Sequence, residues 1–418
     1  MRSPTPPVDL EPQLIQLRRA MHRHPEVGLH LPYTQQLIVD ALQDLPLEVR
    51  LGGGLSSVTA VLHGAIAGPT VLLRADMDAL PLAEVVGRDV RSEIDGVMHA
   101  CGHDLHVATL IGAARLLSKR QHEVAGDIIF MFQPGEEGFN GAGRMIDEGV
   151  LTVTGNRPIA AYALHVTSAK FEPGVFAART GPMMAASDVL SVTVRGAGGH
   201  GSVPHLAQDP IPVACEMALA IQTVVTRTFD VFDPVVVTVG TFHAGTKENV
   251  IPASAAFTAT IRSFSVVNRS KLYEVLPRLI AGIAEGHGLS ADVELTQQYP
   301  VMNNHGPETE FLAETVRDLF GADRYRTMSA PLTSSEDFSR VLDEVPGAYA
   351  MVGACPNGTN PATAAYNHAP DAEFDESVML RGAELFVELA IRRLARTPRI
   401  DHPSVVQQEE GHAPAGIY

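Results

Sequence analysis

Two hydrophobic periodicities alternate along the first part of the chain. Some segments carry apolar residues at the spacing of an amphipathic helix, whereas others are short apolar runs typical of buried strands. The predicted helices cover residues 10–24, 34–45 and 104–119, and the predicted strands cover 56–64, 70–76, 127–133 and 160–166. Strands that alternate with helices indicate an α/β fold with a mainly parallel central sheet.

The pattern changes in the middle of the chain. Predicted strands at 188–196, 234–245, 254–264 and 291–300 are interleaved with predicted helices at 209–229 and 269–288. This β-α-β-β-α-β order is that of a ferredoxin-like unit. Helices at 310–320, 334–345 and 376–395 and a strand at 348–354 then resume the first pattern.

The sequence therefore predicts a discontinuous α/β domain interrupted by an inserted satellite. We expect the α/β domain over 1–183 and 301–400, the satellite over 184–300, and a polar, Pro-rich C-terminal tail over 401–418. The length of 418 residues supports this division, because a chain of this size rarely folds around one core.

Composition narrows the class of protein. A hydrophobic content of 45% with 19% charged residues is typical of a soluble globular chain. The net charge of −17 argues against a nucleic-acid or anionic-membrane partner. No window approaches the length of a membrane span, and the N-terminus lacks the apolar core of a signal peptide. The three cysteines are widely spaced and imply no disulfide framework, so we expect a cytoplasmic protein.

Candidate chemistry is concentrated in four short motifs. They are MHACGHD (98–104), QPGEEG (133–138), ALHV (163–166) and NHAP (367–370), which carry Cys101, His103, Glu136, Glu137, His165 and His368. Thiolate, imidazole and carboxylate together suit one or two divalent ions such as Zn, Mn, Co or Ni. Two of the motifs follow predicted strands directly or end them, and ligands of open α/β sheets bind at the carboxyl ends of strands. We therefore expect the motifs to converge on one metal site.

The doubled glutamate suggests metal-assisted hydrolysis. One carboxylate can hold metal while its neighbour accepts a proton from water. The alternative is a solvated pair of loop carboxylates. Asp76 and Asp78 either form a turn or bind and orient ligands, and the sequence leaves both interpretations open. His106, directly after the Cys-Gly-His segment, can support a ligand from behind.

Other candidates are weaker. The sequence does not favour a serine hydrolase, because it lacks the G-x-S-x-G nucleophile elbow. His200 lies in a glycine-rich turn, where it can hydrogen-bond a developing oxyanion. Arg262, in the same insertion, is either a surface ion-pair partner or a ligand for a substrate carboxylate.

From HRHPEVG (22–28) to NHAPDAEFDE (367–376) the chain resembles an amidohydrolase family. This family includes hippurate hydrolases, bacterial N-acyl-L-amino-acid amidohydrolases and plant indole-acetyl-amino-acid hydrolases, and it is a branch of the dinuclear metallopeptidase clan. The strings MHACGHDLHVATLIGAA, QPGEEG, GGHGSVPH, NVIP, TIRSF and SEDF carry the resemblance in order.

The resemblance implies a role for each candidate. The metal ligands would be Cys101, His103, Glu137, His165 and His368, with Glu136 as general base. The satellite would be a lid that dimerises, and His200 would donate to the oxyanion in its own or the partner's active site. The residues expected to contact substrate are Asn249, Arg262 and Ser335. We expect a homodimer or higher homo-oligomer, formed through the satellite, that hydrolyses N-acyl-L-amino acids. The alternatives are a dipeptidase, an N-carbamoyl-amino-acid hydrolase and a non-catalytic binder of acyl conjugates.

Overall fold

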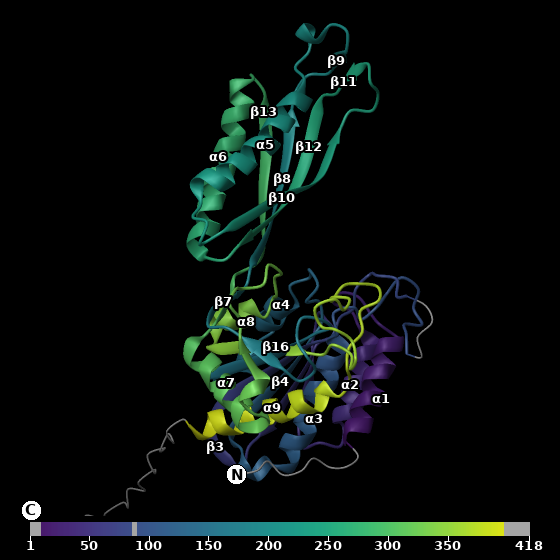
Figure 1. Cartoon of the computed structure of the whole chain (residues 1–418), viewed down its shortest axis with the longest axis vertical. Helices are drawn as coiled ribbons and strands as arrows, with labels where there is room; N and C mark the ends of the chain where they lie inside the picture. The colour runs from purple at the N-terminus through teal and green to yellow at the C-terminus, as the bar shows by residue number, and fades with distance from the viewer. Residues whose placement is uncertain (1–9, 86–89, 397–418) are drawn as a thin grey trace, which may run out of the picture.

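The computed structural model describes residues 10–85 and 90–396. Figure 1 shows an elongated molecule in which a broad α/β unit carries a narrower second unit. Within the described ranges, none of the helices has both the length and the apolar character that crossing a bilayer requires.

The α/β unit is built on an eight-stranded sheet. In spatial order its strands are β1 (Glu48–Leu51), β2 (Val58–His63), β4 (Ala125–Gln133), β3 (Ile66–Asp76), β5 (Ala160–Thr167), β16 (Gly347–Gly353), β6 (Phe176–Ala178) and β15 (Tyr325–Thr327). The central strands β4, β3, β5 and β16 are parallel to one another. Antiparallel pairs lie towards the two sides, between β1, β2 and β4 and between β16 and β6. The predicted fold class, mixed α/β with a mainly parallel centre, is confirmed.

Helices cover both faces of this sheet. One face packs against α1 (Leu10–Arg23), α2 (Pro32–Leu42), α3 (His103–Lys119), α7 (Gly306–Phe320) and α9 (Val378–Ala395). The opposite face packs against α4 (Gly141–Asp147) and α8 (Ser339–Glu344). Neighbouring residues of β3 alternate between the two cores, with Leu73 in the first and Leu72 in the second. Because both faces are covered, the strand reads as a continuous apolar run.

The second unit has its own sheet and core, and we call the stretch from β8 to β13 the satellite. Its four antiparallel strands are, in order, β10 (Val235–Ala244), β12 (Ser254–Ser263), β8 (Ala186–Arg195) and β13 (Ser290–Tyr299). The helices α5 (Pro210–Thr228) and α6 (Val266–Gly286) pack on one face. Asp209 caps α5 by accepting a hydrogen bond from the Ile211 amide, followed by proline at the first helical position.

Short strands complete the fold. The two-residue strands β9 (Gly199–His200) and β11 (Val250–Ile251) pair at the end of the satellite that is remote from the α/β unit (Figure 1). At the other end, β7 (Gly181–Met184) and β14 (Met302–Asn304) pair where the chain enters and leaves the satellite. The domain boundaries given above remain predictions, and the predicted tail lies outside the described residues.

Most predicted elements are found within a few residues of their expected ends. The main error is the helix expected over 334–345, which is limited to Ser339–Glu344. The preceding residues Glu336 and Asp337 instead direct their carboxylates into the α/β core. The three-residue strands were missed because so short a segment shows no periodicity.

Candidate metal centre

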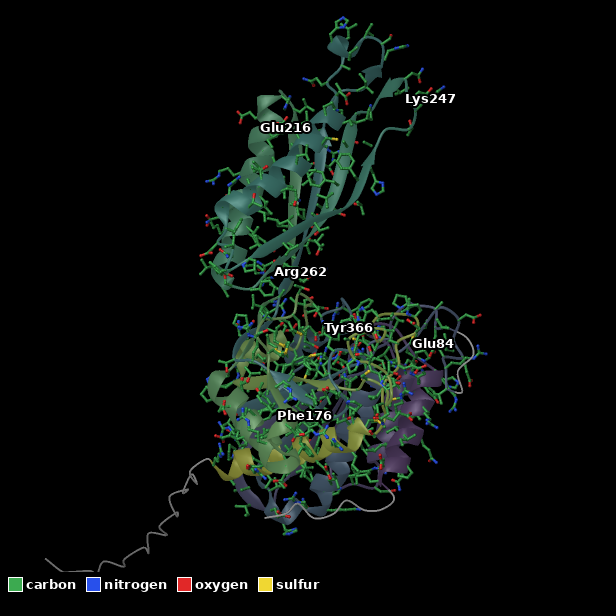
Figure 2. All side chains as sticks on the ribbon, viewed as in Figure 1. Glu84, Phe176, Glu216, Lys247, Arg262 and Tyr366 are labelled. Carbon is green, nitrogen blue, oxygen red and sulfur yellow. The ribbon has the colours of Figure 1, made fainter. Side chains whose placement is uncertain are left out.

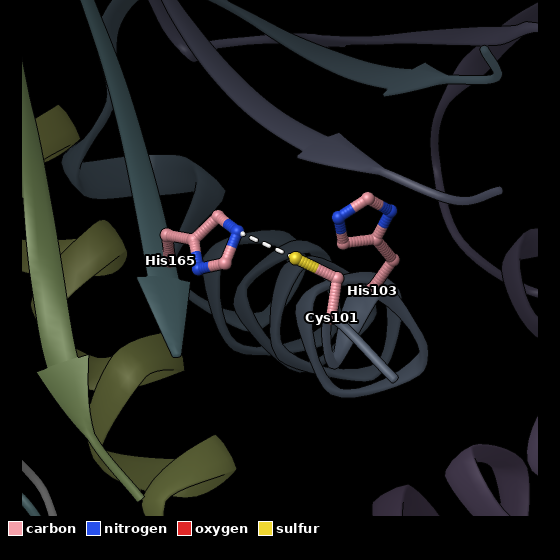
Figure 3. Close-up of side chains that lie close together, drawn as sticks. All are labelled: Cys101, His103 and His165. Carbon is pink, nitrogen blue, oxygen red and sulfur yellow. Dashed lines mark hydrogen bonds between the residues drawn. The ribbon is translucent and has the colours of Figure 1, made fainter. Parts of the chain in front are cut away.

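The four motifs meet at the carboxyl ends of the central strands. Asp76 ends β3, Gln133 ends β4 and precedes the two glutamates, and His165 lies near the end of β5. Cys101 and His103 come from the loop that opens α3. Figure 3 shows the ring of His165 directed at the Cys101 sulfur, with His103 beside it. The parallel strand order therefore gathers side chains that are far apart in sequence.

Cys101 lies between two imidazoles. Its Sγ is 3.3 Å from Nε2 of His165 and 3.3 Å from Nε2 of His368. The same nitrogen of His368 is 3.1 Å from Oε1 of Glu137. His368 adopts a left-handed backbone conformation (φ 70°), and its amide donates to the Ala100 carbonyl. This strained position fixes the NHAP loop against the Cys101 segment.

His103 supplies the test of whether a metal fits. The side chain is fully buried, yet neither ring nitrogen has a hydrogen-bond partner among the described residues. The nearest carboxylate oxygens, of Asp78 and Asp76, are 3.6 and 3.8 Å away. A buried imidazole without partners is costly, so it requires an additional group. A divalent ion matches the donors that surround it.

Three sets of donors lie close enough to hold ions, with all ligand atoms of each set within 4.8 Å of one another. They are Cys101–His103–His165, Cys101–Glu137–His368 and His103–Glu136–Glu137. The first two sets share Cys101, and together these residues would offer donors for two ions. Two further sets, Asp76–His103–His106 and Glu136–Glu336–Asp337, meet the same distance limit but include carboxylates that already pair with Arg74.

Hydrogen bonds behind the ligands set their orientation. His106 Nε2 accepts from the Val166 amide, so its Nδ1 carries the proton and donates to Asp76. The Val166 carbonyl in turn accepts from Nδ1 of His165 at 2.8 Å. This leaves the lone pair of His165 Nε2 facing Cys101, the tautomer that a metal ligand needs. Burial holds the pKa of His165 well below its usual range.

Glu136 and Glu137 are adjacent but electrostatically different. Burial, together with the charges of Glu336 and Glu137, raises the pKa of Glu136 well above its usual range. Burial alone would also raise the pKa of Glu137, but the hydrogen bond from His368 and the charge of His103 lower it overall. The raised pKa makes Glu136 the stronger proton acceptor of the two, whereas the lowered pKa keeps Glu137 ionised, which is the division of labour expected of a base and a ligand.

Asp78 fixes the turn that carries both glutamates. Its Oδ1 accepts from the Glu136 amide at 3.0 Å and its Oδ2 accepts from the Glu137 amide at 3.1 Å. Asp76 likewise acts on the site through His106. Of the two interpretations left open by the sequence, the contacts of both aspartates favour orientation of the site.

Arg74 is a site-supporting residue that the sequence argument missed. Its fully buried guanidinium donates to Asp76 at 2.6 Å, Glu336 at 2.7 Å and Asp337 at 3.1 Å. Tyr349 adds a hydrogen bond to Glu336 at 2.9 Å. An arginine inside the apolar run TVLLRAD was a usable signal, because a charge buried in a central strand must be paired.

The cluster opens into a cavity of about 200 Å³. Its lining combines site residues with the apolar side chains Met184, Leu332 and Met351, which we call the apolar wall. Ser335 and Tyr366 also line it, so the structure brings Ser335 to the site as expected. The cavity has the mixed apolar and polar lining of a small-molecule site.

The predicted satellite residues are not part of this cluster. His200 is exposed on β9, and Asn249 precedes β11, both at the remote end of the satellite (Figure 1). Arg262 lies nearer the α/β unit (Figure 2), where it donates to the hydroxyl of Ser187. Within one chain, His200 therefore lies away from the candidate metal centre.

The chain matches a described protein family over most of its length: residues 72–392 match Peptidase family M20/M25/M40. It is 37% identical over 388 residues to thermostable carboxypeptidase 2 of Saccharolobus solfataricus, covering 92% of this chain and 96% of that protein. It is 34% identical over 386 residues to IAA-amino acid hydrolase ILR1-like 2 of Arabidopsis thaliana, covering 91% and 85%. A Bacillus subtilis structure described as a dinuclear metal binding peptidase from the M20 family shares 31% identity, with a TM-score of 0.79 and coverage of 92% and 99%.

Proposed function

Because the chain belongs to peptidase family M20/M25/M40, a family of hydrolytic enzymes that act on amides, we propose that it hydrolyses N-acyl-L-amino acids to a carboxylic acid and an amino acid. The observation that carries this proposal is the buried His103 ring, whose two nitrogens make no hydrogen bond to the described residues and which lies among thiol, imidazole and carboxylate donors that include Glu136. A site that only bound acyl conjugates would have no use for a second, proton-holding carboxyl.

The proposed ligands are divided between two ions by the donor sets. Cys101, His103 and His165 would hold one, and Cys101, Glu137 and His368 the other. When bound, a divalent ion supplies Lewis-acid chemistry and lowers the pKa of water towards neutrality. The donor types suit Zn, Mn, Co or Ni.

Glu136 carries the proton in this proposal. A carboxyl whose pKa is raised by burial accepts a proton from the attacking water more readily than an ordinary glutamate does. The same carboxyl then returns the proton to the leaving amine. Asp78 keeps the backbone of Glu136 in place during both transfers.

The two ends of the substrate meet different surroundings. The apolar wall of Met184, Leu332 and Met351 receives the acyl group, and Ser335 contacts the substrate from the same cavity. We propose that Arg262, and Asn249 and His200 of the partner subunit, contact the amino-acid carboxylate and the oxyanion of the substrate. The two subunits would form a homodimer through the satellite. This arrangement accounts for a histidine on a glycine-rich turn so far from its own site.

A second candidate is a carboxypeptidase or dipeptidase, favoured by the 37% identity to thermostable carboxypeptidase 2. An N-carbamoyl-amino-acid hydrolase remains a third possibility on the same scaffold. We also propose a cytoplasmic location, because Cys101 can bind metal only as a reduced thiolate.

The test measures amino-acid release from N-acetyl, N-benzoyl and indole-acetyl amino acids, with dipeptides and N-carbamoyl amino acids alongside. We expect release from the acyl amino acids, and we expect Glu136→Gln to retain metal while losing turnover by about 10²- to 10⁴-fold. Glu344→Gln, at the surface of the same unit, is the matched control and should behave as wild type. Release from dipeptides alone would favour the second candidate, and near wild-type turnover by Glu136→Gln would exclude it as the base.

A further inference from the structure

The turn that carries Glu136 and Glu137 is fixed by hydrogen bonds on two sides, and only one of these sides belongs to the α/β sheet. On that side Asp78 accepts the two glutamate amides. On the other side the hydroxyl of Tyr299 donates to the Glu136 carbonyl at 2.7 Å. The same oxygen accepts from the Gly138 amide at 2.9 Å and the Asn140 amide at 3.3 Å.

These three contacts use the full capacity of a phenol. A tyrosine hydroxyl has one proton to donate and two lone pairs to accept with, and each is engaged with the same turn. Tyr299 is only 6% exposed, so water competes little for these bonds. Burial and the nearby carboxyl of Asp337 keep the pKa of Tyr299 above its usual range, which preserves the donated proton.

Tyr299 belongs to the satellite, because it is the last residue of β13. The pairing of β13 with β8 runs without interruption up to Gln297 and then shifts register before Tyr299. Such a bulge bends a strand and re-aims the side chains that follow. Here it directs Tyr299 out of the satellite sheet and into the α/β unit.

The bulge is itself fixed from both units. The Gln298 amide oxygen accepts from the hydroxyl of Ser187 in the satellite at 2.7 Å. The Gln298 carbonyl accepts from the Arg340 guanidinium, on α8 of the α/β unit, at 2.6 Å. Tyr299 therefore lies at one of the two points where the chain passes between the units. Hydrogen bonds to both units fix this segment.

We propose that Tyr299 is a positioning residue that sets the backbone of the Glu136–Glu137 turn and makes this setting depend on the orientation of the satellite. A rotation of the satellite about the point where the chain passes between the units moves Tyr299 and, through three hydrogen bonds, the turn that carries the proposed base. The role in turnover rests on the function proposed above, whereas the hold on the turn does not.

The test compares Tyr299→Phe with Tyr273→Phe, a matched loss of a hydroxyl on α6 of the satellite. Hydrogen exchange is followed for the amides of Gly138 and Asn140, together with metal content, kcat and KM on an N-acyl amino acid. For Tyr299→Phe we expect exchange at these amides to rise about tenfold. We expect kcat to fall about 10- to 100-fold with little change in KM or metal content. Tyr299 bonds the Glu136 carbonyl itself, whereas Glu137 keeps its contacts with Asp78 and His368.

A second variant, Arg340→Met, leaves the hydroxyl intact but frees the bulge, and we expect smaller changes in the same direction. Wild-type exchange at Gly138 and Asn140 in Tyr299→Phe would overturn the proposal. So would a loss of kcat accompanied by loss of metal or by faster exchange throughout the protein, because that pattern marks a general structural role. If the wild type itself turns over no acyl amino acid, the proposed function fails while the exchange measurement still decides the role of Tyr299.

Discussion

At the scale of single residues, the candidate site depends on side chains that hydrogen-bond to other site residues and so fix their positions. Asp76 touches His106, Asp78 touches two backbone amides, and neither reaches the cavity lining directly. The motif positions were recognisable because the proposed ligands lie in short strings that combine Cys, His and Glu with a predicted strand end or helix start. Arg74, Glu336 and Tyr299 were not recognised, because most of their partners are distant in sequence and only the fold brings them together.

Removing the Arg74 charge provides a test at this scale. Arg74→Leu leaves the buried carboxylates of Asp76, Glu336 and Asp337 without their shared cation, so we expect the free energy of unfolding to fall by about 3–5 kcal/mol. Denaturant titration of the variant and wild type measures the difference. The control Arg50→Leu removes an exposed arginine from β1 of the same sheet and should change stability by less than about 1 kcal/mol. Equal stability of Arg74→Leu and wild type would show that the network is not needed to hold the core together.

At the scale of elements, strand direction explains why the site exists. The parallel strands β3, β4 and β5 end on the same edge, and the prediction that the motifs converge there agrees with the observed positions of Asp76, Glu137 and His165. Hydrophobic periodicity was enough to find these strands, since they are long and fully buried. It was not enough for the segment before α8, where Glu336 and Asp337 satisfy Arg74 in place of continuing a helix.

The bulge at the end of β13 shows a second limit of sequence patterns. An alternating strand predicts which face each residue occupies, and one inserted residue reverses the assignment for everything after it. Nothing in the run ADVELTQQYP marks Gln298 as the extra residue. The contact between Tyr299 and the glutamate turn therefore required the structure.

At the scale of the whole molecule, the polar residues that the sequence singled out in the satellite lie away from the candidate metal centre of the same chain. His200 and Asn249 lie at its remote end, whereas the donors lie in the α/β unit (Figure 1). The sequence analysis kept both possibilities for His200, its own site or that of a partner. The distance of His200 from the candidate site of its own chain favours the second, which makes the proposed homodimer part of the proposed mechanism.

Mixing two inactive variants tests that arrangement. In a mixed dimer of Glu136→Gln and His200→Ala, one site combines an intact Glu136 with His200 of the partner subunit. Random exchange of subunits should therefore restore about a quarter of wild-type activity. The measurement is amino-acid release after the two variants are unfolded and refolded together, with each variant refolded alone as the control. Absence of recovery in verified mixed dimers would place His200 outside the partner's reaction.

The most direct test of metal-dependent hydrolysis is to strip the protein with a chelator and add back Zn, Mn, Co or Ni singly. Bound metal and release of amino acid from an N-acyl amino acid are measured on the same samples. We predict no release by the stripped protein, and recovery that rises as up to two ions per chain are bound. Full activity in protein shown to be free of metal would contradict the account.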